Sequence, residues 1–269
     1  MQLEIQVMSK TGGRTRNEDA CGVWSTPGAS FCVLSDGLGG HSGGEVASKL
    51  VVSRILEWFQ ARPACNPEDI AGALETAHAA VLEEQTRVPE MNDMGATAVV
   101  LALDTMHRTA SWGHVGDSRL YCFRRGRIIA QTRDDSLVQQ MVDAGYLQPH
   151  ELRTSPQRNQ LLTALGNDAV VEPRVIPDGF AVEDGDAFLL CSDGFWEYVD
   201  EAEMEQALGA AESVTAWLHS LERGIIARGR KGQDNYSAIA VWCRDTARYA
   251  DTDPTLPSGG SGSHPRSLP

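Results

Sequence analysis

The first part of the chain carries strand-like and helix-like spacings of apolar residues in turn. Apolar and polar residues alternate over positions 3–7, and this two-residue period predicts a half-buried strand. The wholly apolar run 31–34 predicts a buried strand that ends at the turn Ser35-Asp36-Gly37. After a glycine-rich stretch, apolar residues recur at three- and four-residue steps over positions 46–59, which predicts an amphipathic helix.

The middle of the chain has the pattern of an antiparallel sheet. Links of only a few residues join strand-like runs at positions 98–103, 109–115, 119–123 and 127–131. Links this short permit hairpins, whereas parallel pairing needs a long crossover connection. We therefore expect antiparallel pairing in this region.

Helical and strand patterns interleave elsewhere without a break in composition. Helices are predicted over positions 67–81, 136–144, 201–208 and 213–228, and strands over 187–191 and 236–243. Interleaving of this kind predicts one α+β domain over residues 1–244, with helices covering antiparallel sheets. Residues 245–269 are rich in Gly, Ser and Pro, and we expect them to form a disordered tail.

Charge narrows the classes of partner. The 269-residue chain has 37 acidic and 23 basic side chains, which leaves a formal net charge of −14. Nucleic acids and anionic membranes attract clustered Lys and Arg, so we expect neither as a partner. Two interpretations of the acidic surplus stay open: it keeps the protein soluble, or some of the carboxylates bind cations.

The positions of the cysteines and the lack of a secretory signal indicate in which cellular compartment the protein is located. The six cysteines are scattered without a CxxC pair, and four lie in apolar runs, as reduced thiols of a cytosolic protein do. The chain opens with no secretory signal and has no apolar run long enough for a membrane span. We therefore expect a cytoplasmic location. Glycine-rich nucleotide-binding loops and the cysteine–arginine loop of cysteine-based phosphatases are absent as well.

Three aspartates stand where a predicted strand meets a turn. Asp36 and Asp193 each lie in a Ser-Asp-Gly sequence after an apolar run, and Asp234 precedes the last strand. An isolated Asp-Gly is usually turn chemistry. Carboxylates gathered at one edge of a sheet would repel each other unless a cation is present. Oxygen ligands without His or Cys spacing favour Mg²⁺ or Mn²⁺ over Zn²⁺.

Two further segments contain candidate ligands for a metal ion or a phosphate. Asp117 follows Val115-Gly116 at the end of another predicted strand. The run from Arg14 to Asp19 places two guanidinium groups beside two carboxylates. Arginine can bind a phosphate through two hydrogen bonds, and a carboxylate can complete the shell of a metal. Standing alone, this run would be a solvated charged loop.

The chain resembles the metal-dependent serine/threonine protein phosphatases of the PP2C (PPM) type, in their bacterial form. The resemblance runs in order through the blocks GRTRNED, VLSDGLGGHSGGEVAS, MGATAVV, GHVGDSRLY, SLVQQMVDAG, RNQLLTALG, FLLCSDGFWEYV and GQDNYSAIAVW. These blocks span most of the chain between residues 14 and 242. The resemblance implies an α-β-β-α sandwich of two antiparallel sheets flanked by helices.

The resemblance implies a set of metal ligands for two Mn²⁺ or Mg²⁺ ions. Asp36 would bridge the two ions. Asp193 and Asp234 would complete the shell of one ion, and Glu18 and the Gly37 carbonyl would support the other. Two ions close together can share a water, lower its pKa and stabilise an in-line displacement at phosphorus.

The remaining catalytic positions are implied in the same way. Asp19 would orient the attacking water, and Arg14 would bind the phosphate of the substrate. Asp117, together with Asp193, resembles a third-metal site of bacterial members. His41 stands five residues after Asp36. It is a candidate general acid, and equally a residue that contacts substrate or faces solvent.

The predicted function is hydrolysis of phosphoserine and phosphothreonine on proteins, reversing a bacterial Ser/Thr kinase, by a protein that we expect to be a monomer. Residues 146–167 would form a flap beside the active site. Two alternative hypotheses of function stay open. One is a non-catalytic binding module on the same fold, which predicts loss of metal carboxylates. The other keeps the catalysis and places it in a dedicated pathway, such as a bacterial secretion apparatus.

Overall fold

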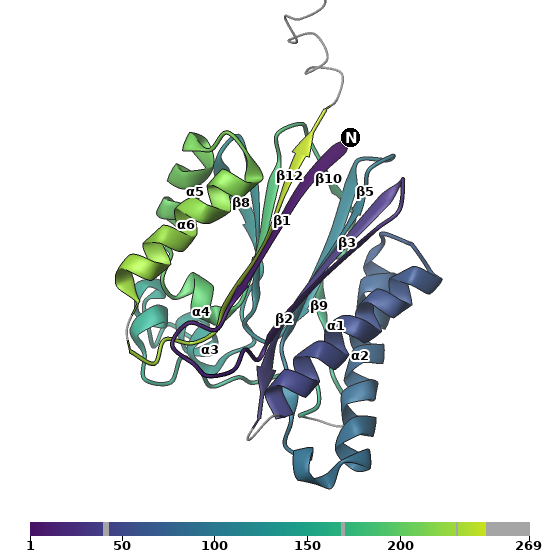
Figure 1. Cartoon of the computed structure of the whole chain (residues 1–269), viewed down its shortest axis with the longest axis vertical. Coiled ribbons are helices and arrows are strands. Elements are labelled where there is room, and N and C mark those ends of the chain that lie inside the picture. Colours follow the sequence, from purple (N-terminus) through teal and green to yellow (C-terminus); the bar gives the residue numbers. More distant parts are fainter. Residues whose placement is uncertain (40–42, 168–169, 230, 246–269) are drawn as a thin grey trace, which may run out of the picture.

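Two antiparallel sheets stack face to face in the computed structural model of the protein (Figure 1). The structure describes residues 1–39, 43–167, 170–229 and 231–245. The predicted tail therefore lies outside the described residues, except for Asp245.

The smaller sheet has five strands in the order β1-β12-β11-β7-β8, and every pair in it is antiparallel. Its strands are β1 (Gln2–Lys10), β7 (Arg119–Arg124), β8 (Arg127–Gln131), β11 (Ala187–Cys191) and β12 (Tyr236–Arg244).

The larger sheet has seven strands, with the main order β10-β6-β5-β3-β2. Two short strands complete it, because β4 pairs with β3 and β9 pairs with β6. Its strands are β2 (Asp19–Ser25), β3 (Ala29–Leu38), β4 (Gly95–Ala96), β5 (Ala98–Asp104), β6 (Thr109–Val115), β9 (Arg174–Val175) and β10 (Phe180–Ala181).

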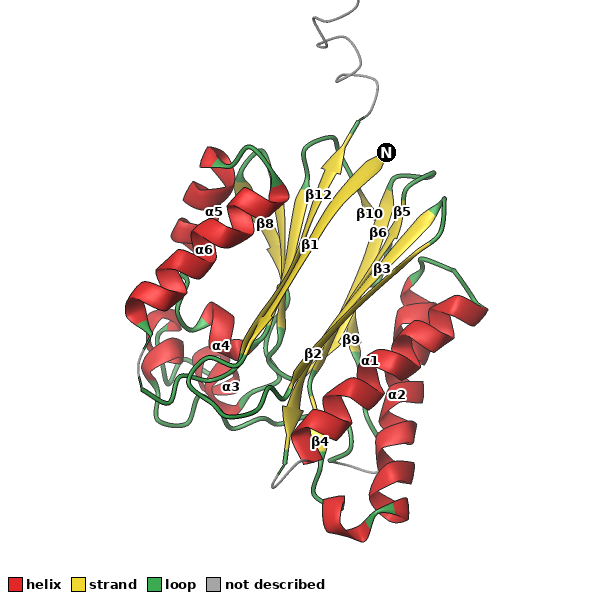
Figure 2. Cartoon of the chain, viewed as in Figure 1, coloured by secondary structure: helices red, strands yellow, loops and turns green. Residues whose placement is uncertain are grey.

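Helices cover the outer face of each sheet (Figure 2). The larger sheet is covered by α1 (Gly43–Ala61) and α2 (Pro67–Arg87), and the smaller one by α5 (Glu201–Ala210) and α6 (Val214–Arg228). Shorter elements are α3 (Leu137–Asp143), α4 (Asp193–Trp196) and the 3₁₀ helices η1 (Pro89–Met91) and η2 (Pro149–Thr154). The α-β-β-α sandwich implied by the resemblance is thus confirmed.

Three apolar layers hold this architecture together. One lies between the smaller sheet and its helices, another between the larger sheet and its helices, and the third between the two sheets. The layer between the sheets includes Leu34 of β3, Leu190 of β11 and Ile239 of β12, all fully buried. Alternation along each strand sends one set of side chains to a helix and the other to the opposite sheet.

Helix starts follow the sequence signals closely. Asn66 precedes α2, and its side chain accepts a hydrogen bond from the Asp69 amide at 2.8 Å. Ser136 caps α3 in the same way through the Gln139 amide. These side chains satisfy amides that the first turn of a helix leaves without partners.

The end of β3 differs from the prediction. The strand continues through the expected turn to Leu38, so Asp36 lies within the strand rather than after it. The reason is that β3 has partners on both sides: Asp36 stands opposite Asp19 of β2, and Gly37 stands opposite Ala96 of β4. Strand β2 itself was not predicted, because the charged run before it dominates the local pattern.

The described part of the chain contains no helix long and apolar enough to cross a membrane. All six cysteines are free thiols, as predicted.

Replacing Leu190 by alanine should destabilise the protein by about 2–5 kcal/mol, because the cavity would open between two sheets that cannot collapse onto it. Ile129 on the edge strand β8 is 46% exposed, and Ile129→Ala should cost less than about 1 kcal/mol. Urea unfolding of both variants checks this, and equal losses would contradict the packing described above.

Candidate active site

The predicted metal and phosphate ligands line one cavity. One of them, Asp193, belongs to α4, which lies at the end of the sandwich away from the N-terminus (Figure 1). The cavity has a volume of about 220 Å³. It is lined by Arg14, Glu18, Asp36, Gly37, Leu38, Gly39, Asp117, Asn159, Leu161, Asp193 and Asp234. Every described residue predicted to bind metal or phosphate is among them.

Pairing between β2 and β3 sets one side of the cavity. Asp19 lies directly opposite Asp36 on these strands, and Gly37 donates its amide to the Glu18 carbonyl at 3.1 Å. On the other side of β3, the Thr97 hydroxyl accepts the Asp36 amide at 3.0 Å. The main chain at Asp36 is therefore held from both edges of its strand.

Two neighbouring strands of the smaller sheet set the opposite side. Asp193 begins α4 just after β11, and Asp234 stands just before β12. Gly194 passes so close to the next segment that a Cβ on it would lie 2.0 Å from the Asn235 carbonyl oxygen. Only glycine permits this approach, which brings the Asp193 and Asp234 backbones together.

Asp19 is not among the residues that line the cavity. Its side chain is buried, and one oxygen, Oδ2, accepts a hydrogen bond from the Ser192 hydroxyl at 2.8 Å. Ser192 in turn accepts the Ser237 amide at 3.0 Å. Oδ1 of Asp19 is buried and has no hydrogen-bond partner.

Asn235 is a supporting residue that the sequence reasoning did not single out. Its side chain accepts the Glu18 amide at 2.8 Å and donates to the Thr11 and Arg16 carbonyls. It thereby fastens the loop that carries Arg14 and Glu18 to the start of β12. Its position directly after Asp234 was the available signal.

Burial raises the pKa of several of these carboxyl groups. The pKa values of Asp36 and Asp117 lie well above their ordinary value, first because of burial and then because of neighbouring aspartates. Burial, with charges nearby, also raises the pKa of Asp193 to about 7, and burial raises that of Asp19 to about 6. A positive charge beside these carboxyl groups would therefore lower their pKa values and favour the charged form.

Among the described residues that line the cavity, Arg14 is the arginine. Its Nη2 donates to Oδ2 of Asp234 at 2.9 Å, and its side chain is half exposed. The remaining donors of the fork are therefore free to meet a ligand at the cavity mouth.

These residues fit a hard divalent cation. The negatively charged side chains that line the cavity are all carboxylates, which can bind a metal through oxygen. The buried Oδ1 atoms of Asp19 and Asp193 have no hydrogen-bond partner. Within the described ranges, no three His, Cys, Asp or Glu side chains are arranged to hold a metal by themselves. A bound ion would therefore need water or main-chain carbonyls as well, which is usual for Mg²⁺ and Mn²⁺ but not for structural Zn²⁺.

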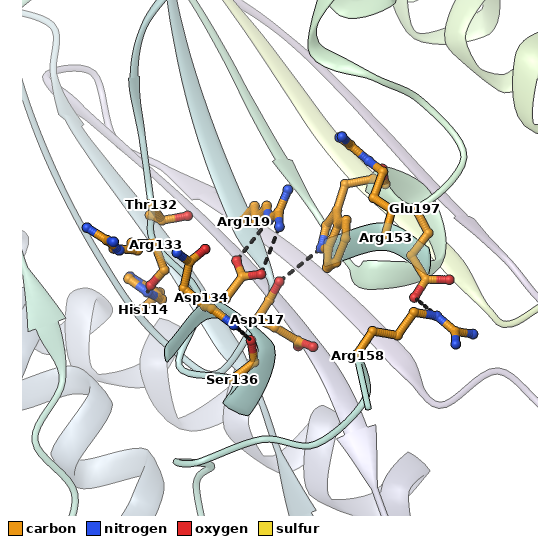
Figure 3. A network of polar contacts seen from close by, with 12 residues as sticks. His114, Asp117, Arg119, Thr132, Arg133, Asp134, Ser136, Arg153, Arg158 and Glu197 are labelled. Atoms are coloured by element: carbon orange, nitrogen blue, oxygen red, sulfur yellow. Dashed lines mark hydrogen bonds and ion pairs between the residues drawn. The ribbon is translucent and has the colours of Figure 1, made fainter. Parts of the chain in front are cut away.

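The flap region borders the cavity. Asn159 and Leu161 line it, and the segment is tied to α3 by a hydrogen bond from the Leu137 amide to the Gln160 carbonyl at 2.8 Å. Arg158 pairs with Glu197 at 2.6 Å (Figure 3). His41 lies outside the described residues, so its role stays a prediction.

The sequence pattern of the family "Protein phosphatase 2C" matches residues 9–228. The chain belongs to the protein phosphatase 2C family. The carboxylates of the cavity come from blocks spread along the matched segment, except Asp234, which follows it.

Individual relatives agree with this membership. The chain is 32% identical over 252 residues to the serine/threonine protein phosphatase PstP of Mycobacterium tuberculosis, covering 93% of this chain and 46% of that protein. It thus spans about half the length of this protein phosphatase 2C relative.

Solved structures agree as well. The catalytic domain of PstP in complex with two manganese ions is 29% identical, with a TM-score of 0.77, over 90% of this chain and 99% of that one. PppA, described as a key regulatory component of the T6SS in Pseudomonas aeruginosa, is 31% identical, with a TM-score of 0.73, over 90% and 97%.

Gly194→Ala should distort the start of β12, because its Cβ would meet main-chain atoms that cannot move aside. We expect a loss of about 1–3 kcal/mol of stability and weaker Mn²⁺ binding. In the control Gly209→Ala, a Cβ on α5 meets nothing within 4 Å, so stability should stay the same or rise slightly. Thermal unfolding and Mn²⁺ titration measure both effects. Similar behaviour of the two variants would contradict the proposed close approach.

The raised pKa of Asp193 predicts how stability depends on pH in the presence of EDTA. At pH below about 4 this carboxyl is protonated in both the folded and unfolded protein. As pH rises toward 7, unfolding releases its proton and becomes more favourable, so its contribution to stability is lost. Asp193→Asn cannot ionise, and its stability relative to the unchanged protein should rise between pH 5 and pH 8. Urea unfolding of both proteins at pH 5 and pH 8 checks this. The prediction is contradicted if the free energy of unfolding of Asp193→Asn, relative to the unchanged protein, falls between the two pH values.

Proposed function

We propose that this chain hydrolyses phosphoserine and phosphothreonine in proteins, with two Mn²⁺ or Mg²⁺ ions and room for a third. The observation that carries the proposal is the convergence of carboxylates from separate segments, with raised pKa values, beside one arginine in a small open cavity. Family membership and the manganese ions of the PstP catalytic domain support it.

The carboxylates around the cavity would hold the ions. We assign Asp36 to both of the first two ions, Asp193 and Asp234 to one, and Glu18 with the Gly37 carbonyl to the other. Asp117 and Asp193 would hold the third. Bound Mn²⁺ or Mg²⁺ supplies Lewis-acid stabilisation of phosphoryl charge and lowers the pKa of water.

Asp19 is suited to orient a water molecule. The Ser192 hydroxyl occupies its Oδ2 and fixes the carboxyl group in place. Its buried Oδ1 has no hydrogen-bond partner and would be left to accept a hydrogen bond from a water. Because Asp19 is buried, that hydrogen bond would be made in a site of low dielectric, where orientation has most effect.

Arg14 is suited to bind the phosphate of the substrate. Its guanidinium stands at the cavity mouth and can offer two parallel hydrogen bonds to phosphoryl oxygens. A second hollow, of about 730 Å³, also contains arginines, namely Arg153, Arg158 and Arg228, but none of the carboxylates predicted to bind metal lines it. Arg14 lies beside those carboxylates, so it is the arginine placed to bind a phosphate together with the ions. His41 remains a candidate general acid or substrate contact.

A non-catalytic module on this fold is less well supported, because the chain retains all of its predicted metal carboxylates. We also propose a cognate bacterial Ser/Thr kinase as the opposing enzyme, a monomeric state and a cytoplasmic location. The six free thiols fit a reducing compartment. The likeness to PppA supports a role in a secretion apparatus as the setting of the same activity.

Hydrolysis of a phosphothreonine peptide with Mn²⁺ tests the activity. Asp193→Asn should lower kcat/KM by at least about 100-fold, since it removes a charged ligand, and EDTA should abolish turnover. Asp178→Asn, at an exposed position that is not among the residues lining the cavity, is the matched control and should keep full activity. Phosphate release is the readout. Equal rates for all samples would exclude the proposed function.

A further inference from the structure

Trp196 joins two of the segments that carry cavity carboxylates. It is the last residue of α4, whose first residue is Asp193. Its indole Nε1 donates to the main-chain carbonyl of Asp117 at 2.9 Å, and the ring is buried. The turn after β6 and the helix after β11 are thus connected by one hydrogen bond.

Arg119 holds the indole ring in place. Its guanidinium carbon lies 3.6 Å from the centre of the Trp196 ring. The same guanidinium donates twice to the Asp134 carboxylate, each time at 2.8 Å, and both side chains are almost fully buried (Figure 3). A planar fork fixed by two hydrogen bonds gives the ring a rigid surface to stack on.

The flap contacts the same helix. Arg153 of η2 donates to the Trp196 carbonyl at 3.0 Å and to Glu201 at 2.9 Å. The end of α4 is therefore held on one side by the flap and on the other by the turn that carries Asp117.

We propose that Trp196, held by the Arg119–Asp134 pair, is a positioning residue that sets the spacing of Asp117 and Asp193 for binding a divalent cation, and that Arg153 couples the flap to this spacing. The proposal rests on the proposed function only in the assignment of those two carboxylates to a cation. Trp196, Arg119, Asp134 and Arg153 are not among the residues that line the cavity, so they would act on a cation through the carboxylates that they position.

Trp196→Phe tests this directly, because it keeps an aromatic ring for Arg119 and removes only the indole N–H donor. Loss of a group that orients metal ligands typically weakens metal binding by about 10- to 100-fold. We expect the weakest Mn²⁺ site of the apo protein to lose affinity by at least about tenfold. Free Mn²⁺ is measured by electron paramagnetic resonance, which does not depend on catalysis.

Trp217→Phe is the matched control. Trp217 is also fully buried, and its Nε1 donates to the Met204 carbonyl at 3.3 Å, in the layer between the smaller sheet and its helices. It should lose comparable thermal stability and keep its Mn²⁺ affinity. Equal affinities for the two phenylalanine variants would overturn the proposal.

A second variant covers the case in which Trp196→Phe does not fold. Arg153→Gln removes the flap contact at a partly exposed side chain and should weaken the same site by roughly two- to tenfold, the effect of losing the hydrogen bond to the Trp196 carbonyl. Unchanged affinity there would overturn the coupling to the flap. If the unchanged protein binds Mn²⁺ but hydrolyses no phosphopeptide, the proposed function fails while this comparison of affinities still stands.

Discussion

Burial of several carboxyl groups around one small cavity is the constraint on which the rest of this structure depends. Asp36, Asp117 and Asp193 have pKa values raised by burial and by neighbouring carboxylates, so the folded chain keeps them together at a cost in stability. A divalent cation offsets that cost, because it places opposite charge where the carboxylates repel. The groups that destabilise the protein without metal are thus the source of its affinity for cations.

The sandwich gathers these groups from both sheets. Asp36 comes from β3 of the larger sheet, whereas Asp193 and Asp234 flank β11 and β12 of the smaller one. Their separation is therefore set by the apolar layer between the sheets and by close backbone approaches such as that of Gly194 to Asn235. A packing change far from the cavity reaches the site through this layer, since protein interiors are close-packed and transmit strain.

Local patterns predicted most of the helices and strands, and they failed where partners distant in the sequence decide the outcome. Positions 31–34 predicted a strand, but its continuation through Asp36 depends on β2 and β4, which no local period announces. Asp36, Asp117, Asp193 and Asp234 were predicted because each stands next to a glycine or a strand end, whereas Glu18 and Asp19 were implied by the family resemblance. Asn235 and Ser192 were not singled out, because their value lies in hydrogen bonds to the distant residues Glu18 and Asp19.

The charge of Arg119 must be neutralised for the cavity to attract cations. An unpaired guanidinium this near to Asp117 would itself stabilise the carboxylate, lower its pKa and repel a metal ion. The Asp134 carboxylate accepts hydrogen bonds from Nε and Nη2 of Arg119. Its negative charge raises the pKa of Asp117, which the charge of Arg119 lowers. The pair can therefore support the indole ring of Trp196 as a rigid surface of little net charge, which leaves the negative charge of the cavity to the bound ions.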